Sequence, residues 1–236
     1  MNIESAGLDA KSAYKLLIGS IIPRPIAWIS TESTSGVGNL APVSFFTCVG
    51  RKPPKVSLSI QPKSDGATLK DSFVNIRDTG EFVTNMATLP QAFALHRSAV
   101  EYEPDVDEFD AVGVEKVASS LVKPPRIKDA PVALECKVDQ TFSAPDGLHH
   151  IVWGEVVSFY VRDDLYINGR IDFGAIAPIA RLAAEYTVVD NAFVPPLDDA
   201  VLTERASRRM RRLDGQGEEY STVDSSGWSA SGSVQG

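Results

Sequence analysis

Short stretches of alternating apolar and polar residues run through most of the chain, separated by glycine, proline and aspartate. A period of two is typical of a strand that buries one face, and Val-Ala-Leu-Glu-Cys-Lys-Val at 132–138 is a clear example. Many short strands with few helices predict a mainly β protein, with a barrel rather than a parallel sheet. The expected strands cover residues 25–31, 39–49, 55–60, 81–86, 111–119, 132–143 and 149–161.

Helical patterns are fewer. We expect helices over residues 10–18, 71–78 and 89–100, with Gly80 just past the second, where glycine commonly ends a helix. A further helix is expected over residues 198–213, because its acidic residues lie at the start and its arginines near the end, as the helix dipole favours. Its charges are interpreted as the solvated face of a helix that docks elsewhere, with a basic ligand-binding patch as the alternative.

These elements predict three parts of unequal size. Residues 1–195 are expected to form one domain, because single β-barrel domains reach this length. Residues 196–220 are expected to form an amphipathic helical extension after two consecutive prolines. Residues 221–236 are rich in serine and glycine and are expected to be flexible.

The composition narrows the classes of partner. The hydrophobic fraction of 43% suffices for a core, and no apolar run approaches the roughly 18–20 residues of a membrane span. The formal charge of −8 argues against nucleic acid or an anionic membrane as a partner. Cys48 and Cys136 lie in apolar stretches and are expected to be buried, reduced thiols. With no signal peptide visible, we expect a cytoplasmic protein.

Residues 36–41, Gly-Val-Gly-Asn-Leu-Ala, match the loose dinucleotide fingerprint G-x-G-x-x-G/A. That fingerprint requires a helix that begins at the glycines, so that backbone amides face the pyrophosphate. Here Pro42 and the aromatic and β-branched residues after it indicate a strand, and no acidic residue ends a second strand about 20 positions later. We therefore interpret the glycines as a hairpin turn.

Four motifs follow one another in a set order: Pro-Arg-Pro-Ile-Ala-Trp-Ile-Ser at 23–30, Gly-Asn-Leu-Ala-Pro-Val-Ser-Phe-Phe at 38–46, Lys-Pro-Pro at 52–54 and Lys-Asp-Ser at 70–72. This order resembles the flavin reductase-like family, which has an FMN-binding split-barrel fold and includes flavoredoxins. The resemblance runs from about Tyr14 to about Tyr186. It implies a Greek-key-type β-barrel with flanking helices that binds FMN, with NADH or NADPH as co-substrate.

The Lys-Asp-Ser motif suits the phosphate of FMN. It lies at the start of an expected helix, where unpaired amides and the positive dipole end favour an anion. Lys70 adds a charge and Ser72 a hydroxyl, whereas Asp71 has the wrong sign and is expected to cap the helix. On chemistry alone the motif is also compatible with a plain helix cap beside a surface lysine, and the resemblance favours the phosphate.

The remaining expected cofactor contacts come from the resemblance and from strand geometry. Five residues align with the flavin-binding loop of the family: Asn39, Leu40, Ala41, Pro42 and Ser44. Phe45 and Phe46 alternate, so we expect one beside the flavin ring and the other in the core, with Phe45 as the candidate ring contact. Ser57 and Ser59 share one face of a strand, which indicates either a polar pocket or a solvated edge.

Two arginines complete the candidates. Arg24 lies between two prolines and is either a phosphate ligand or a surface cation. Arg181 lies in residues 178–186, which resemble the closing Pro-Ile-x-Arg-Leu-Gly-Gly-x-Tyr segment of the family, with Ala183 and Ala184 in place of the glycines. It is a candidate contact to the pocket wall or to a partner subunit.

No residue is assigned as catalytic, and no spacing of Cys and His indicates a metal site. His149 and His150 precede a strand and should face opposite sides, so at most one faces a site. One of them could donate a proton to substrate, but ordinary partnered histidines are the favoured interpretation.

Three functions remain open. The leading hypothesis is an FMN-dependent oxidoreductase that passes hydride or electrons from NAD(P)H to free flavin, another protein or a small acceptor. The alternatives are a flavoredoxin-like electron carrier and a non-catalytic FMN-binding protein. In each case a homodimer is expected, since related split barrels bind FMN near a subunit interface and the C-terminal helix needs a surface to cover.

Overall fold

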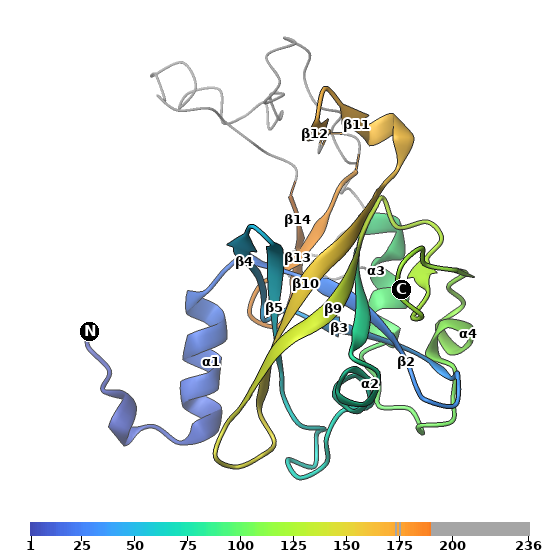
Figure 1. Ribbon diagram of the computed structural model, residues 1–236. Coiled ribbons are helices and arrows are strands. Elements are labelled where there is room, and N and C mark those ends of the chain that lie inside the picture. Colours follow the sequence, from blue (N-terminus) through green and yellow to red (C-terminus); the bar gives the residue numbers. More distant parts are fainter. Residues whose placement is uncertain (173, 175, 190–236) are drawn as a thin grey trace, which may run out of the picture.

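The computed structural model describes residues 1–172, 174 and 176–189. Figure 1 shows long, twisted strands that curve around a common interior, with helices packed on the outside and at one end. The extension at 196–220, with its expected helix over 198–213, and the tail at 221–236 lie outside the described residues. Among the described helices, none is both long and apolar enough to cross a membrane.

Seven antiparallel strands form the main sheet, in the order β3-β2-β6-β9-β10-β5-β4. The two edge strands, β3 and β4, are consecutive in the chain, and the amide of Ser59 in β5 donates to the carbonyl of Phe45 between them (2.9 Å). The edge strand β3 also contacts β5 near the other edge, so the sheet curls round into a barrel, and the prediction of a mainly β split barrel is confirmed (Figure 1). The strands are β2 (Ala27–Glu32), β3 (Gly38–Val43), β4 (Phe46–Arg51), β5 (Pro54–Ile60), β6 (Glu81–Met86), β9 (Val132–Ser143) and β10 (His150–Val161).

Three small sheets accompany the barrel, and the sequence patterns did not predict them. They are β1-β13-β14 (Arg24–Pro25, Ile179–Arg181, Tyr186–Val188), β7-β8 (Lys116–Val117, Arg126–Ile127) and β11-β12 (Tyr166–Ile167, Arg170–Ile171). Their strands have only two or three residues, which is too short for a visible period. The first sheet pairs Arg24 with Arg181 and so joins the two ends of the domain.

The helices begin and end close to where polar and glycine residues place them. In α2, Gly80 adopts the left-handed conformation (φ 73°) and its amide donates to Ile76, as its position after the expected helix predicts. The α-helices are α1 (Ala10–Ser20), α2 (Asp71–Thr79), α3 (Ala92–Arg97) and α4 (Glu108–Val112), and the 3₁₀ turns are η1 (Ser5–Gly7), η2 (Leu89–Gln91) and η3 (Asp163–Leu165).

The core lies on both faces of β2. Ile29 and the other inward-facing residues of the barrel pack with Phe73 and Ile76 of α2, which lies at one end of the barrel (Figure 1). Trp28 faces the opposite side and packs with Leu95 of α3 and Phe109 of α4. Both clusters are fully or nearly fully buried. The strand that carries the first family motif is thus fixed from both sides, and it holds its neighbour β3 in place.

Three expected elements differ from the structure. The expected strand at 111–119 is wrong, because Asp107 accepts a hydrogen bond from the amide of Phe109 and caps the short helix α4, which leaves only β7 as strand. The expected helix at 89–100 ends at Arg97. The expected strand at 39–49 is two strands, interrupted at Ser44 and Phe45.

The expectations for the glycine turn and the histidines are confirmed, and that for the cysteines is confirmed for one of the two. The turn before β3 is a hairpin in which Gly36 has a φ of 84°, as interpreted above, and no helix begins at these glycines. Cys136 is buried and unpaired as expected, but Cys48 is exposed, because β4 is an edge strand with its middle residues uncovered. His149 is exposed beside Asp146 and His150 is buried, so the two face opposite sides as predicted.

Candidate functional site

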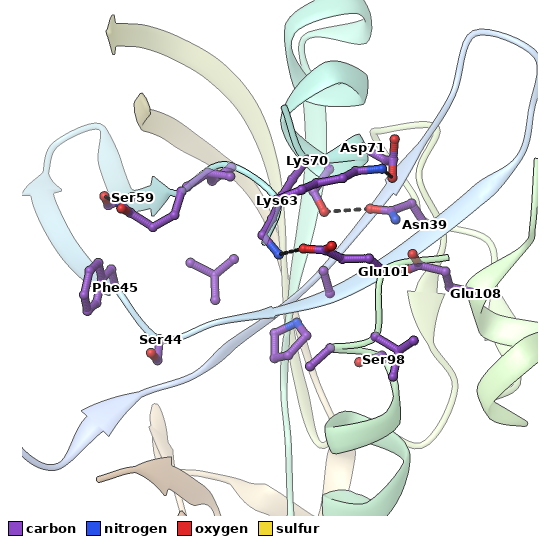
Figure 2. A pocket seen from close by; sticks show the side chains of 18 of the residues that line it. Asn39, Ser44, Phe45, Ser59, Lys63, Lys70, Asp71, Ser98, Glu101 and Glu108 are labelled. Carbon is purple, nitrogen blue, oxygen red and sulfur yellow. Dashed lines mark hydrogen bonds and ion pairs between the residues drawn. The ribbon is translucent and has the colours of Figure 1, made fainter. Parts of the chain in front are cut away.

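A pocket of about 240 Å³ lies between β3, the end of β5, the start of α2 and the segment 98–101 (Figure 2). It brings together nine of the thirteen predicted cofactor contacts, which come from three separate stretches of sequence. Those nine are Asn39, Ala41, Pro42, Ser44, Phe45, Ser59, Lys70, Asp71 and Ser72. Residues that sequence reasoning did not select also line it: Tyr14, Val43, Ile60, Gln61, Lys63, Ser98, Ala99, Val100, Glu101 and Glu108.

The start of α2 provides positive charge and free donors. Lys70 is the residue before the helix, and its side chain makes no capping bond. Lys63 lies beside it (Figure 2). Within the described residues, the backbone amides of Asp71 and Ser72 donate to no protein acceptor. These amides, two lysines and the positive end of the helix dipole together favour an anion.

Asp71 does not cap the helix as expected. It is the first helical residue, and its carboxylate pairs with Lys63 Nζ at 2.8 Å, a hydrogen bond that raises the pKa of Lys63. Lys63 is therefore held next to the helix start. The role that we predicted for Asp71 is replaced by one in which it fixes a second cation in the pocket.

Asn39 connects three elements of the site. Its side-chain oxygen accepts hydrogen bonds from Ser72 of α2 (2.7 Å) and from Thr31 of β2 (3.1 Å), and Thr31 in turn accepts from Asn75. All four side chains are buried, so unpaired groups here would cost free energy. These bonds hold the Asn39 side-chain oxygen toward α2 and β2, so the side-chain nitrogen of Asn39 faces Glu108.

Glu108 is a buried acid in the pocket wall, with 6% of its surface exposed. Its Oε2 accepts a hydrogen bond from the amide of Leu40 (2.7 Å). Burial raises its pKa to about 7, an effect that the bonds from Leu40 and Asn39 partly offset and that the charge of Asp71 reinforces. Near neutral pH this group therefore carries a proton far more often than an ordinary glutamate does. Sequence reasoning missed it because residues 107–112 carry no recognisable active-site spacing.

The opposite side of the pocket is apolar. Ala41, Pro42 and Val43 of β3 line it, and Phe45 lies at its edge against the ring of Tyr14, with ring centroids 6.4 Å apart. Phe46 instead packs with the barrel interior, as the alternation predicted. An apolar wall opposite a row of donors is the arrangement that a planar, polar-edged ligand requires.

Four predicted contacts lie outside this pocket. Arg24 is 5% exposed, and its guanidinium donates to the carbonyls of Ile18, Ile21 and Leu182, so it is not a surface cation. It also contacts Ser44 Oγ at 3.4 Å and thus lies behind the pocket wall. The other three are Leu40, whose side chain is in the core; Ser57, on the same face of β5 as Ser59 but farther along; and Arg181, which stacks on Tyr186.

The residues present fit the phosphate and ring of FMN. A dianionic phosphate needs cations and N–H donors, and Lys63, Lys70 and the amides at the start of α2 supply both. The hydroxyls of Ser44 and Ser59 line the pocket on the side of Phe45, away from the lysines, and offer partners to a polyhydroxyl chain (Figure 2). The donor set therefore agrees with a phosphate-bearing flavin.

Comparisons with known proteins point to one family. Residues 18–175 match the family model described as "Flavin reductase like domain". An uncharacterised protein of Aquifex aeolicus is 38% identical over 181 residues, covering 76% of this chain and 91% of that protein. Component B of nitrilotriacetate monooxygenase from Bacillus cereus superposes with a TM-score of 0.78 at 32% identity, over 82% of this chain and 98% of that one.

A second solved structure, the 2-nitrobenzoate 2-nitroreductase of Pseudomonas fluorescens, superposes with a TM-score of 0.75 at 28% identity. The superposition covers 84% of this chain and 97% of the nitroreductase chain. The family model spans well over half of the 236 residues. It includes every residue named above as lining the pocket except Tyr14. The chain belongs to the flavin reductase-like family.

Proposed function

We propose that the protein is an FMN-dependent oxidoreductase that draws hydride from NADH or NADPH and passes electrons to free flavin or to another acceptor. One observation carries the proposal: the pocket places Lys63, Lys70 and the free amides of α2 at one end and the apolar wall of β3 along one side. Membership of the flavin reductase-like family supports the choice of ligand. Bound FMN would supply the redox chemistry, and the protein would supply binding and orientation.

Each part of the pocket has a distinct task in this proposal. Lys70 and the backbone amides of Asp71 and Ser72 would hold the phosphate, with Lys63 as a second cation, while the Ser72 hydroxyl remains bonded to Asn39. Ser44 and Ser59 would bind the ribityl chain, and residues Ala41 and Pro42 would support the ring. Glu108, through Asn39 and the amide of Leu40, would keep the first half of β3 in position.

We also propose a homodimer. Helix α1 has no buried residue: its Leu16 and Leu17 expose 44% and 50% of their surface, and Ile21, just past its end, exposes 56%. Apolar side chains gathered on one helix commonly mark an interface. Tyr14 of the same helix reaches the pocket, so a second subunit docked on α1 would lie next to the flavin site.

The reaction can be tested with purified protein. NADH or NADPH oxidation is followed by the loss of nicotinamide absorbance, with and without added FMN. We expect turnover that depends on FMN and saturates with the nicotinamide nucleotide. Slow oxidation combined with rapid reduction by a donor protein would indicate an electron carrier instead. A protein that takes up no FMN would contradict the proposed function outright.

A further inference from the structure

Glu101 lies in the pocket beside the groups proposed to bind phosphate. Its carboxylate accepts hydrogen bonds from the hydroxyl and the amide of Ser64 (2.7 and 2.8 Å), and it lies 3.6 Å from Lys70 Nζ. Figure 2 shows it pointing at Lys70. The bonds from Ser64 lower the pKa of Glu101 below its ordinary value, so the group is ionised at neutral pH.

The loop that holds Glu101 is braced from within. Asp65 accepts hydrogen bonds from the hydroxyl and amide of Thr68 and from the amide of Ala67, which lower the pKa of Asp65 to about 2. The amide of Lys63 donates to the carbonyl of Thr68 at 2.7 Å. Because this turn keeps its shape through its own bonds, Ser64 remains in place to hold the Glu101 carboxylate when a ligand enters.

The contact between Glu101 and Lys70 is easily displaced. Both side chains are about one-third exposed, and the atoms are 3.6 Å apart, so the pair contributes little stability. An incoming phosphate would therefore compete successfully for Lys70. Glu101 would keep its two bonds to Ser64 and leave an unneutralised negative charge beside the phosphate.

The other two acids of the pocket do not have this effect. Asp71 is neutralised by Lys63 at 2.8 Å. Glu108 is buried and retains much of its proton near neutral pH, since burial raises its pKa to about 7. Among the described pocket residues, Glu101 is thus the carboxylate whose charge opposes a bound anion.

We propose that Glu101 is a specificity-determining residue. Its charge lowers the affinity of the pocket for phosphate-bearing flavins and so reduces the ratio by which FMN binds more tightly than riboflavin. The inference rests on the proposed function, because it assumes that a flavin occupies this pocket. It adds that the affinity for FMN is held below what the two lysines and the helix allow.

The test is Glu101→Gln, which removes the charge and keeps an acceptor for Ser64. FMN and riboflavin are titrated separately into apoprotein, and binding is followed by flavin fluorescence. We expect the variant to bind FMN about tenfold more tightly, the order expected for removing one unit charge beside a phosphate in a partly hydrated pocket. Riboflavin lacks the phosphate, so its Kd should stay within about twofold, and the gain for FMN should shrink as salt is added.

Two variants serve as controls. Asp105→Asn removes the same charge from an exposed residue four positions away. Ser64→Ala removes the hydroxyl bond to Glu101 but keeps the bond from the Ser64 amide and the charge of Glu101. Both should leave the ratio of the two flavin affinities near that of the parent. A gain from Ser64→Ala equal to that from Glu101→Gln would show that loss of the Ser64 bond, not loss of the charge, is responsible, and would overturn the proposal.

The outcomes separate this inference from the function on which it rests. A parent protein that binds neither flavin contradicts the proposed function, and the role of Glu101 falls with it. If the parent prefers FMN and Glu101→Gln leaves the ratio of the FMN and riboflavin affinities unchanged, the role of Glu101 is overturned but the proposed function is not. If the Gln variant does not fold, Glu101→Ala removes the same charge and is read in the same way.

Discussion

Single side chains from distant parts of the chain define the chemistry of the pocket. The amide of Leu40 binds Glu108, 68 positions later, and Ser72 reaches back to Asn39 across 33 positions. Neither contact has a local sequence signature. The hydroxyl and cation of the Lys-Asp-Ser motif were predictable from residue type and helix position. Glu101, which lies beside Lys70, and Glu108, which accepts from the amide of Leu40, were not.

The raised pKa of Glu108 should make the free energy of unfolding depend on pH. Its pKa is raised to about 7 in the folded protein from an ordinary 4.5, so the folded state binds the proton more tightly than the unfolded state. Its contribution to stability is full below about pH 4.5 and is lost as the pH rises to 7. A shift of this size corresponds to at most about 3 kcal/mol. Glu108→Gln removes the titrating group and should therefore abolish this loss of stability at higher pH.

The measurement is the free energy of unfolding by denaturant at several values between pH 5 and pH 8. The Glu108→Gln variant should gain stability relative to the parent across this range and level off above pH 7. Glu103→Gln, an exposed acid in the same segment, should run parallel to the parent. Parallel curves for Glu108→Gln would show that the buried carboxyl titrates in its ordinary range.

At the scale of elements, alternation and helix boundaries carried most of the predictive information. The long strands β9 and β10 were expected at 132–143 and 149–161, because each shows the period of two that a half-buried strand requires. Helix α2 was expected from its motif and from Gly80. Helix α4 was missed, because five residues contain little more than one turn and show no period.

Gly154 of β10 offers an element-level test of barrel packing. A Cβ at this position would overlap the ring of Phe82 in β6 and approach Cys136 Cβ to 3.2 Å. Because Phe82 is fully buried, the ring has no free space to enter. Gly154→Ala should therefore destabilise the protein by about 1–3 kcal/mol, measured by denaturant unfolding.

Phe82→Leu provides the matched partner for that variant. Alone it should destabilise by leaving a cavity. Combined with Gly154→Ala it should cost less than the sum of the two single changes, because the added methyl fills part of the space that the ring leaves. Strict additivity would mean that β10 and β6 do not press together at this point.

At the scale of the whole molecule, the barrel was predictable because the count of short strands and the order of four motifs agreed. The small β1-β13-β14 sheet was not, since it joins residues 24–25 to residues 179–188 through strands of two and three residues. Long-range pairing of such short strands depends on the rest of the barrel being formed. Arg24, expected in contact with phosphate or solvent, is instead buried at this junction.

The homodimer is testable at the same scale. Light scattering at micromolar concentration should give twice the chain mass of 25.4 kDa. Leu17→Glu places a charge on the exposed apolar side of α1 and should shift the protein toward the monomer. A parent protein that stays monomeric would contradict the dimer, and a dimer unaffected by Leu17→Glu would place the interface away from α1.

The central claim is that the start of α2 binds the phosphate of FMN, and comparing FMN with riboflavin tests it most directly. Each charged hydrogen bond to phosphate contributes roughly 1.5–3 kcal/mol. Lys70→Ala combined with Lys63→Ala removes both cations of the pocket and should therefore weaken FMN binding by about two to four powers of ten if the effects add, with a much smaller change for riboflavin. A folded double variant that binds FMN as tightly as the parent would contradict the account.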